Sequence, residues 1–109
     1  MGERDLATTF AALGDPVRQA IVEQLADGDA TVGELAAGFP ISLQAVSRHI
    51  GVLESAGVVS RRKVAQTRPV HLEADALARS SEWLEAHRRR LEQRFERLDE
   101  LLEEMKGYP

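Results

Sequence analysis

Apolar side chains recur every three or four residues in several stretches of the chain, which is the spacing of one face of an α-helix. The first stretch predicts a short helix from Leu6 to Leu13, ended by Gly14. The second predicts a helix that Asp15 caps and that extends up to Gly28. Its apolar stripe consists of Val17, Ala20, Ile21 and Leu25. The chain is therefore expected to begin with two amphipathic helices.

Residues 31–41 predict a very short third helix followed by a turn. Thr31 and Glu34 have the spacing of a capping box, in which each side chain bonds the backbone N–H of the other residue. Gly38 is expected to end this helix in the left-handed conformation, and Pro40 prevents the helix from continuing. The apolar face that should pack on the rest of the protein consists of Val32, Leu35 and Ala36.

A fourth helix is predicted between Ser42, a good N-cap, and Gly57, which stops it. Its buried stripe should be Val46, Ile50 and Leu53. The opposite face carries hydrogen-bonding or small residues, which suit the base edges of the DNA major groove. Glutamine and arginine can pair with adenine and guanine there, and serine permits a close approach. The predicted base-reading residues are Ser42, Gln44, Ser47 and Arg48.

His49 lies beside the buried stripe of this helix, about 60° away from it. Two interpretations remain open for its ring. The favoured one is a packing residue that hydrogen-bonds the backbone, and the other is a secondary contact to DNA.

A β-hairpin is predicted after the fourth helix. Two short β-rich runs, 58–64 and 69–72, lie on either side of a turn formed by residues 65–68. Pro69 has no backbone N–H to donate, which places it at a sheet edge. The tip of this hairpin could reach a neighbouring groove or phosphate.

Charge is distributed unevenly along the chain, which has a net charge of −4. Residues 42–72 hold five basic side chains and one acidic one, whereas the remainder holds nine basic and seventeen acidic ones. Four of the basic residues lie in the predicted hairpin: Arg61, Arg62, Lys63 and Arg68. A local basic patch on an acidic body favours contacts to DNA phosphates. Because strand side chains alternate, either Arg61 and Lys63 or Arg62 alone should face DNA.

Residues 74–106 predict one long amphipathic helix. Its apolar stripe contains Leu84, Leu91, Leu98 and Met105, spaced by sevens, together with Trp83, Phe95, Leu101 and Leu102. Because earlier helices already supply a core, we expect this helix to pack against its copy in a homodimer. The predicted interface residues are Leu6, Phe10, Trp83, Leu84, His87, Leu91, Phe95, Leu98 and Leu102. We expect Trp83 to belong to the dimer core, and a cavity between the terminal helices would suit an effector whose identity is open.

Composition narrows the alternatives further. The chain has 109 residues, of which 43% are hydrophobic, as expected of a single small domain. It contains no cysteine, so disulfides, thiolate metal sites and cysteine nucleophiles are excluded. It shows neither a signal segment nor an apolar run of roughly 18 residues, so we expect a soluble, cytoplasmic protein with no membrane partner. No catalytic triad and no glycine-rich phosphate loop can be assembled, so neither an enzyme nor a cofactor is expected.

Several runs, in this order, resemble the ArsR/SmtB family of winged helix-turn-helix repressors. They are ALGDPVR at 12–18, VGELA at 32–36, SLQAVSRHIGVLE at 42–54 and AGVV at 56–59, followed by the charged strand. The resemblance covers nearly the whole chain. It implies a mainly α fold with a small β-hairpin wing, in the order α-α-α-α-β-β-α. It also implies a homodimer built through the terminal helices, in which the fourth helix reads DNA.

The chain departs from the metal-sensing members of this family. Those members carry cysteines in the helix that corresponds to residues 32–37, where this chain has the sequence VGELAA without a cysteine. Others use ligands on the terminal helix, but Asp75 has no histidine two residues later, and three residues after His87 the chain has Arg90 instead of glutamate. A zinc site of His87 and Glu85 across a dimer is the alternative, although zinc usually requires three or four protein ligands. No metal site is therefore expected, and His87 should be a partly buried interface residue.

Together these features predict a homodimeric regulator, of the repressor type, that binds double-stranded DNA. Each subunit would place residues 42–48 in successive major grooves of a roughly palindromic site, about 34 Å apart. A winged-helix module that binds protein is the alternative, because a fold alone does not determine function. The polar reading face argues against that alternative. The operator, the regulated genes and any effector are not encoded in a recognisable motif.

Overall fold

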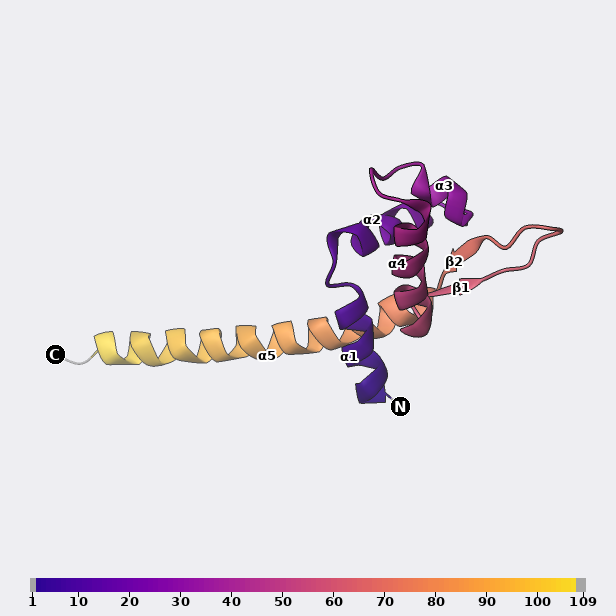
Figure 1. Ribbon diagram of the computed structural model, residues 1–109. Helices are drawn as coiled ribbons and strands as arrows, with labels where there is room; N and C mark the ends of the chain where they lie inside the picture. The colour runs from indigo at the N-terminus through magenta and orange to yellow at the C-terminus, as the bar shows by residue number, and fades with distance from the viewer. Residues whose placement is uncertain (1, 108–109) are drawn as a thin grey trace.

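The computed structural model describes residues 2–107, with the elements labelled in Figure 1. They are α1 (Gly2–Ala12), α2 (Pro16–Leu25), α3 (Val32–Ala36), α4 (Leu43–Ser55), β1 (Val59–Arg61), β2 (Val70–Leu72) and α5 (Ala74–Lys106). This order confirms the predicted α-α-α-α-β-β-α arrangement, and α5 has the predicted bounds. The first two helices differ at their ends: α1 begins before Leu6, and α2 ends at Leu25 instead of continuing to Gly28.

Asp15 caps α2 as predicted. Its carboxylate accepts hydrogen bonds from the backbone N–H groups of Val17, at 2.9 Å, and of Arg18, at 3.1 Å. Pro16 occupies the first turn, where its missing N–H leaves no bond unmade. The hydrogen bond from the Arg18 backbone lowers the pKa of Asp15 below its usual value. Partial desolvation opposes this effect, and the neighbouring His49 and Arg18 side chains reinforce it.

We expect Asp15→Asn to remove part of the acid sensitivity of the fold. Asparagine can still cap the helix, but it does not titrate. A carboxylate whose pKa is lowered by folding contributes stability above its unfolded pKa of about 3.9, and that contribution is lost as pH falls through the folded value. Urea unfolding between pH 7 and pH 3 should therefore show a shallower acid decline for Asp15→Asn than for the natural protein. Asp27→Asn, at an exposed position after α2, is the control, and equal acid declines for all three proteins would contradict the prediction.

Capping side chains also define α3 and α4. The Thr31 hydroxyl accepts from the Glu34 N–H, at 3.2 Å, and the Glu34 carboxylate accepts from the Thr31 N–H, at 3.0 Å, which confirms the capping box. The Ser42 hydroxyl accepts from the Ala45 N–H at 3.0 Å and begins α4. Gly57 follows α4 with φ of +78°, a conformation that glycine adopts readily.

The predicted role of Gly38 is wrong. The residues after α3 form a turn, in which the Gly38 N–H donates to the Leu35 carbonyl and the Phe39 N–H donates to the Ala36 carbonyl. Gly38 does not take a positive φ in this turn. A Cβ there would lie 3.0 Å from Nε2 of Gln24 on α2, the end of a flexible side chain, and 3.6 Å from the Leu35 carbonyl oxygen, which is an ordinary contact. The turn therefore does not require glycine for its backbone conformation.

The four helices α1, α2, α3 and α4 and the hairpin pack around one apolar core. Its buried members are Ala12, Ile21, Leu25, Leu35, Val46, Ile50, Leu53, Val58, Val59 and Val70. The predicted stripe of α4 is confirmed, since its three residues are all fully buried. None of the residues in this cluster comes from α5, whose buried side chains among the described residues are Ala76 and Ser80, near the beginning of the helix. Most of the core therefore forms without α5.

The hairpin is shorter than predicted. β1 and β2 pair antiparallel over three residues each, with Ser60 opposite His71, and a further isolated bridge joins Val64 to Thr67. Ala65, with φ of +54°, lies in the turn between those two residues. A link that the sequence did not reveal is Ala30, which exchanges two backbone hydrogen bonds with Val70 and ties the segment before α3 to β2.

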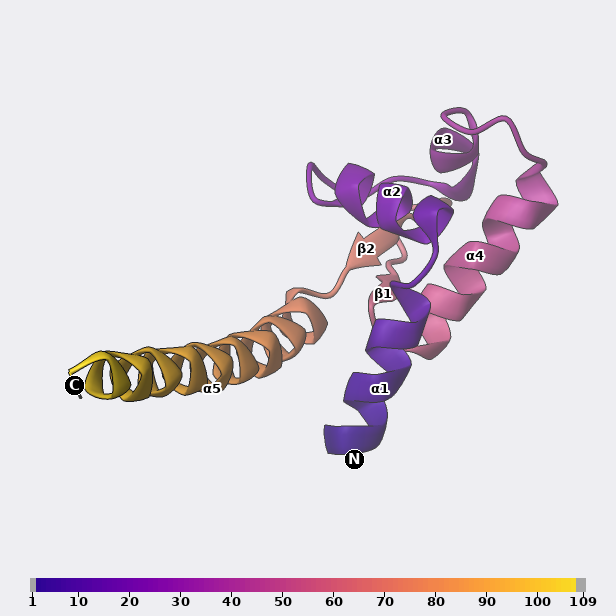
Figure 2. The ribbon, with the colours of Figure 1, turned by 90° about the vertical axis from the view of Figure 1, so that its left-hand side faces the viewer.

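The helix α5 extends away from the rest of the molecule, on the side opposite the hairpin (Figures 1 and 2). The molecule measures 77 × 31 × 22 Å, and its radius of gyration is 20.3 Å. A compact domain of this length would have a radius of gyration of about 13 Å. Within residues 2–107, no helix combines the length and the apolar character required to cross a membrane.

Candidate nucleic-acid interface

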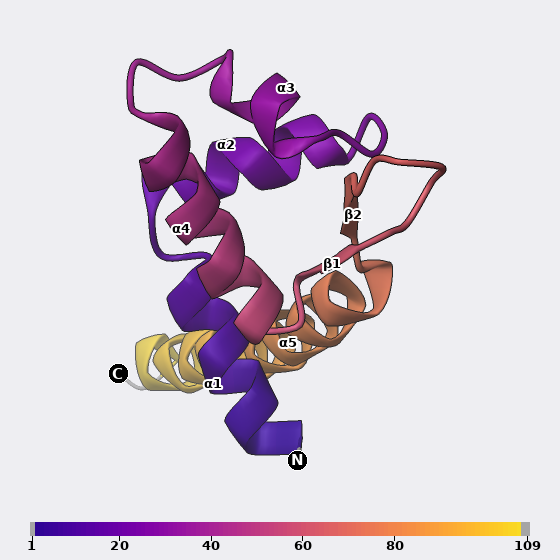
Figure 3. The same cartoon turned by 45° about the vertical axis from the view of Figure 1, so that its right-hand side comes forward.

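The polar face of α4 is open to solvent, as the helical pattern predicts. Gln44, Ser47 and Arg48 are all exposed. No hydrogen bond or ion pair with another described residue engages these three side chains. Figure 3 shows α4 on the near side of the helical body, with the hairpin beginning beside its C-terminal end. Three donor-bearing side chains are thus free to contact an external partner.

Ser42 has a structural role in addition to the predicted contact. Its hydroxyl oxygen accepts the Ala45 N–H, so it stabilises the start of α4. The hydroxyl hydrogen remains able to donate to a phosphate or a base. Ser42 therefore positions the first turn of the helix on which the other predicted residues lie.

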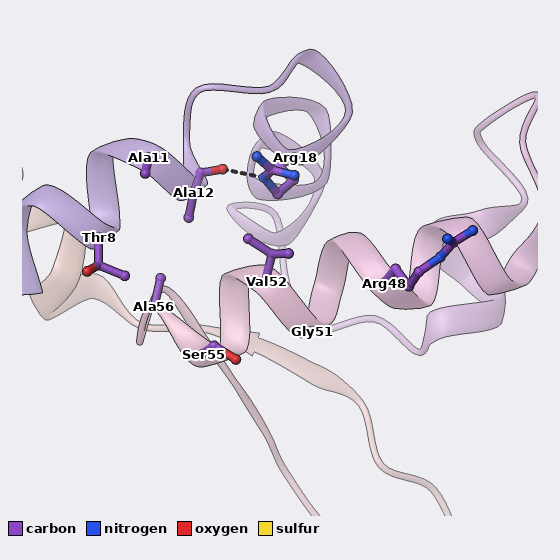
Figure 4. A pocket seen from close by; sticks show the side chains of 9 residues that line it. All are labelled: Thr8, Ala11, Ala12, Arg18, Arg48, Gly51, Val52, Ser55 and Ala56. Atoms are coloured by element: carbon purple, nitrogen blue, oxygen red, sulfur yellow. Dashed lines mark hydrogen bonds between the residues drawn. The ribbon is translucent and has the colours of Figure 1, made fainter.

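A shallow hollow of about 650 Å³ lies between α1 and α4, beside Arg48 (Figure 4). Its walls are small side chains from both helices, and Arg18 lies at its edge. Arg18 is held in place because its Nε–H donates to the Ala12 carbonyl at 2.6 Å. Arg48 has no such restraint, and Figure 4 shows it running along α4 toward the helix N terminus. The two arginines therefore differ: one is part of the scaffold, and the other is available for binding.

His49 is turned toward α2 and away from the exposed face. Its Nδ1 lies 3.2 Å from a terminal nitrogen of Arg18 and 3.7 Å from the Asp15 carboxylate. An arginine N–H can only donate, so Nδ1 accepts this bond. The favoured interpretation as a packing residue is supported, but the partner is a side chain and not the backbone. This geometry gives no support to His49 as a reader of bases.

Gly51 is half-buried on α4 and lines the hollow between α1 and α4. A Cβ at this position would meet no described atom within 4 Å, and its φ is not positive. Glycine in the middle of a helix nevertheless costs roughly 0.5–1 kcal/mol relative to alanine. The unfilled space is therefore open to whatever approaches α4 from outside.

We expect Gly51→Ala to raise the free energy of unfolding by about 0.5–1 kcal/mol, because alanine favours the helix and no neighbour obstructs its Cβ. Urea unfolding monitored by circular dichroism measures the change. Gly57→Ala is the matched control, and it should instead destabilise the protein by about 1 kcal/mol, because its φ is +78°. A loss of stability in Gly51→Ala would show that a packing constraint exists there.

The basic residues of the hairpin occupy two kinds of position. The Arg61 side chain is only 24% exposed, and its Nε lies 3.8 Å from Glu54 of α4. The Arg62 head lies 3.8 Å from Glu73. Lys63 and Arg68 are exposed, and neither forms an ion pair with another residue of the described chain. The most available positive charges thus lie toward the tip of the hairpin.

The predicted alternation of Arg61, Arg62 and Lys63 between two faces stays a prediction. It assumed a strand that continued to Val64, but β1 ends at Arg61. Beyond Arg61 the antiparallel pairing nevertheless continues, because the Arg62 N–H donates to the Pro69 carbonyl at 2.9 Å and Val64 pairs with Thr67. Arg61 lies beside Glu54 of α4, but its buried Nε has no hydrogen-bond partner among the described residues.

The apolar stripe of α5 is uncovered. Every residue from 86 to 107 is exposed, including Leu91, Phe95 and Leu98 at 48–57%. At the beginning of the helix, the Trp83 ring meets Phe10 of α1 edge-on, with ring centroids 5.5 Å apart. Such a continuous apolar strip is the expected sign of an interaction surface.

Two side chains on α5 bear on the alternative of a zinc site. The ring of His87 stacks on Trp83, and its Nδ1–H donates to the Trp83 carbonyl at 2.8 Å. Hydrogen bonds from Arg88 and Arg89 engage Glu85 and, with Arg88 as the main cause, lower the pKa of Glu85 to about 2. Among the described residues, no cluster of three or more histidine or acidic side chains could hold a metal ion. The Glu85 carboxylate therefore serves a surface ion-pair network.

A short helix and turn thus precede an exposed polar helix, and a hairpin with free basic residues follows it. This arrangement defines a winged helix-turn-helix DNA-binding protein. A family profile described as a helix-turn-helix domain matches residues 13–62. An ArsR family transcriptional regulator of known crystal structure is 32% identical, with a TM-score of 0.75 over 84% of this chain and 95% of that one. The chain belongs to the ArsR family of transcriptional regulators.

Two characterised relatives agree with this assignment. The transcriptional regulator Rv2034 of Mycobacterium tuberculosis is 46% identical over 63% of this chain and 64% of its own length. The transcriptional repressor SdpR of Bacillus subtilis is 35% identical over 69% of this chain and 83% of its own length. Both relatives are regulators of transcription.

Proposed function

We propose that this protein is a homodimeric transcriptional repressor that reads a roughly palindromic operator. The observation that carries the proposal is the polar face of α4, where Gln44, Ser47 and Arg48 are exposed and have no partner in the described chain. The opposite face of the same helix is fully buried, so the helix is held rigidly while this face remains free. The repressor of Bacillus subtilis, as a relative, supports the direction of regulation.

Base recognition would come from the N-terminal half of α4. In helix-turn-helix proteins, this part of the second helix lies deepest in the major groove. Arg48 can donate two hydrogen bonds to a guanine, and Gln44 can pair with an adenine. Ser47 is short, which allows the helix to approach the bases. A single α4 covers only a few base pairs, so a second copy is needed for a long operator.

Phosphate contacts would come from the hairpin. Lys63 and Arg68 are its free cations, and they would contribute affinity that does not depend on sequence. Arg62 lies 3.8 Å from the Glu73 carboxylate and would contribute less. Arg61 is largely buried beside Glu54 and would be the least accessible of the four. The local positive charge also explains how a chain with a net charge of −4 can bind DNA.

The second subunit would pack on α5. A helix of 33 residues is about 50 Å long, and α1 covers only its beginning. The remaining stripe is apolar over several turns and is too large to be stable in water alone. A two-fold interface buries this surface against itself and sets two copies of α4 in a fixed spacing. Successive major grooves on one face of DNA are about 34 Å apart.

The test is a selection of bound fragments from fragmented genomic DNA by the purified protein. We expect enrichment of a short motif with two inverted half-sites, centred about 10 base pairs apart. The affinity for that motif should fall steeply with salt concentration, because the hairpin contacts release counterions. Absence of any enriched motif would contradict the proposal and favour a module that binds protein. Enrichment of a single, unrepeated half-site would contradict the dimeric part alone.

A further inference from the structure

A second hollow, of about 470 Å³, lies where α3 meets the beginning of α4. It is lined by Val32 and Gly33 of α3 and by Leu43, Gln44 and Ser47 of α4. Two of these residues belong to the polar face described above. The other three are apolar or lack a side chain, and they give the hollow an apolar wall directly beside two hydrogen-bonding groups.

Leu43 is a large apolar side chain of α4 that the fold leaves 52% exposed, compared with 43% for Val52 in the second half of the same helix. It is the first residue of the helix and follows the Ser42 cap. It belongs neither to the buried core nor to the partly buried residues packed on it, whereas Val32 is one of the latter. The packing of the chain therefore does not explain a leucine at this position.

Its place on the helix points toward DNA. Leu43 directly precedes Gln44 and lies one turn before Ser47, and the three line the same hollow. The first turn of a recognition helix is the part that enters the major groove most deeply. On the groove edge of the four bases, the one apolar group is the 5-methyl group of thymine. An apolar wall at this point can exclude water from that methyl group, whereas it offers nothing to a donor or an acceptor.

We propose that Leu43, backed by Val32, is a specificity-determining residue that contacts a thymine methyl group next to the base paired with Gln44. This inference rests on the proposed function, since it assigns a further contact to the same helix. One buried methyl group contributes enough free energy for about a four-fold change in affinity at each half-site.

The experiment replaces each thymine of the selected operator by deoxyuridine, one symmetric pair of positions at a time. Deoxyuridine keeps the hydrogen bonds of thymine and lacks only the methyl group. With the natural protein, fluorescence anisotropy should show a loss of about four-fold per half-site at one thymine and little change at the others. Leu43→Ala should bind the thymine and deoxyuridine operators equally at that position.

Ile41→Ala is the matched control. Ile41 is also an exposed aliphatic residue, at 37%, and it lies in the turn just before Ser42 without lining the hollow. We expect Ile41→Ala to retain the preference for thymine. Circular dichroism melting of both variants verifies that α4 is intact, so a loss of preference can be attributed to the missing contact.

Three outcomes would overturn the inference. If the natural protein binds every deoxyuridine operator as well as the thymine operator, no methyl group is read, although DNA binding itself stands. If Leu43→Ala keeps the full preference, another residue makes the contact. If no operator is selected at all, the inference fails together with the proposed function, and this failure is distinct from the first two because binding is absent.

Discussion

Replacing Leu91 and Leu98 together by aspartate is expected to convert the protein into a monomer and to lower its affinity for the operator at least 100-fold. Both side chains lie on the uncovered stripe of α5, where they are 48% and 51% exposed in the isolated chain. In a two-fold interface each substitution would be present once in each subunit, so four carboxylates would be buried in an apolar contact. Burial of unpaired carboxylates is far too costly to be tolerated. The intramolecular fold should survive, since the side chains that α5 buries within the chain, Ala76 and Ser80, lie near its beginning and far from both substitutions.

The loss of operator affinity follows from the loss of the second reading helix. When two half-sites are linked in one dimer, the second contact forms at a high effective concentration and typically strengthens binding by 10²–10⁴-fold. Sedimentation equilibrium should give a mass of 12.0 kDa for the variant and twice that value for the natural protein. Fluorescence anisotropy with the full operator measures the affinity.

Gln93→Asp is the control for this experiment. Gln93 lies two residues beyond Leu91, on the opposite face of α5, and it is exposed. The same new carboxylate at that position should leave both the mass and the affinity unchanged. A double aspartate variant that remained dimeric would show that the subunits meet through another surface.

Arg48→Ala is expected to remove discrimination at one base pair of each half-site, at a cost of about 1–3 kcal/mol per half-site. Arg48 is exposed on α4 and has no intramolecular partner in the described chain, so its removal should leave the stability of the fold almost unchanged. The affinity for the operator and for a set of single-base variants provides the measurement. The natural protein should separate the bases at one position, and Arg48→Ala should bind all four about equally there.

Lys63→Ala gives the contrasting result. As a free cation of the hairpin, Lys63 should contribute to phosphate binding, so its loss should weaken binding to all DNA sequences alike and reduce the salt dependence. Arg48→Ala should change the base preference more than the salt dependence. If Arg48→Ala retained the full base preference, the assignment of this residue to the major groove would be refuted.

Local patterns were sufficient to predict most elements of the fold. The caps at Asp15 and Ser42 are side-chain to backbone bonds within three residues, so the sequence alone contains both partners. The bounds of α5 were predicted correctly because its apolar spacing continues without interruption. The prediction failed at Gly38, whose φ is not positive, and at β1, which ends three residues before the end of the predicted run.

In the candidate site too, local patterns predicted some features correctly and missed those that depend on contacts between distant residues. Helical periodicity placed Gln44, Ser47 and Arg48 on one exposed face, because 3.6 residues per turn follow from the backbone alone. The sequence pattern could not distinguish the free cations of the hairpin from Arg61, which lies beside Glu54. It also overlooked Leu43, because an apolar residue at the start of a helix is normally assigned to the core.

The sequence by itself determined the element order, the helix caps, the buried face of α4 and the apolar stripe of α5, since each depends on residues within a few positions of one another. Only the tertiary structure decided that His49 turns toward Asp15 and Arg18 and that Arg61 is largely buried beside Glu54. It also decided that Leu43 and Val32 share one hollow beside Gln44. These contacts join different elements, and their formation depends on how the helices and the hairpin pack together.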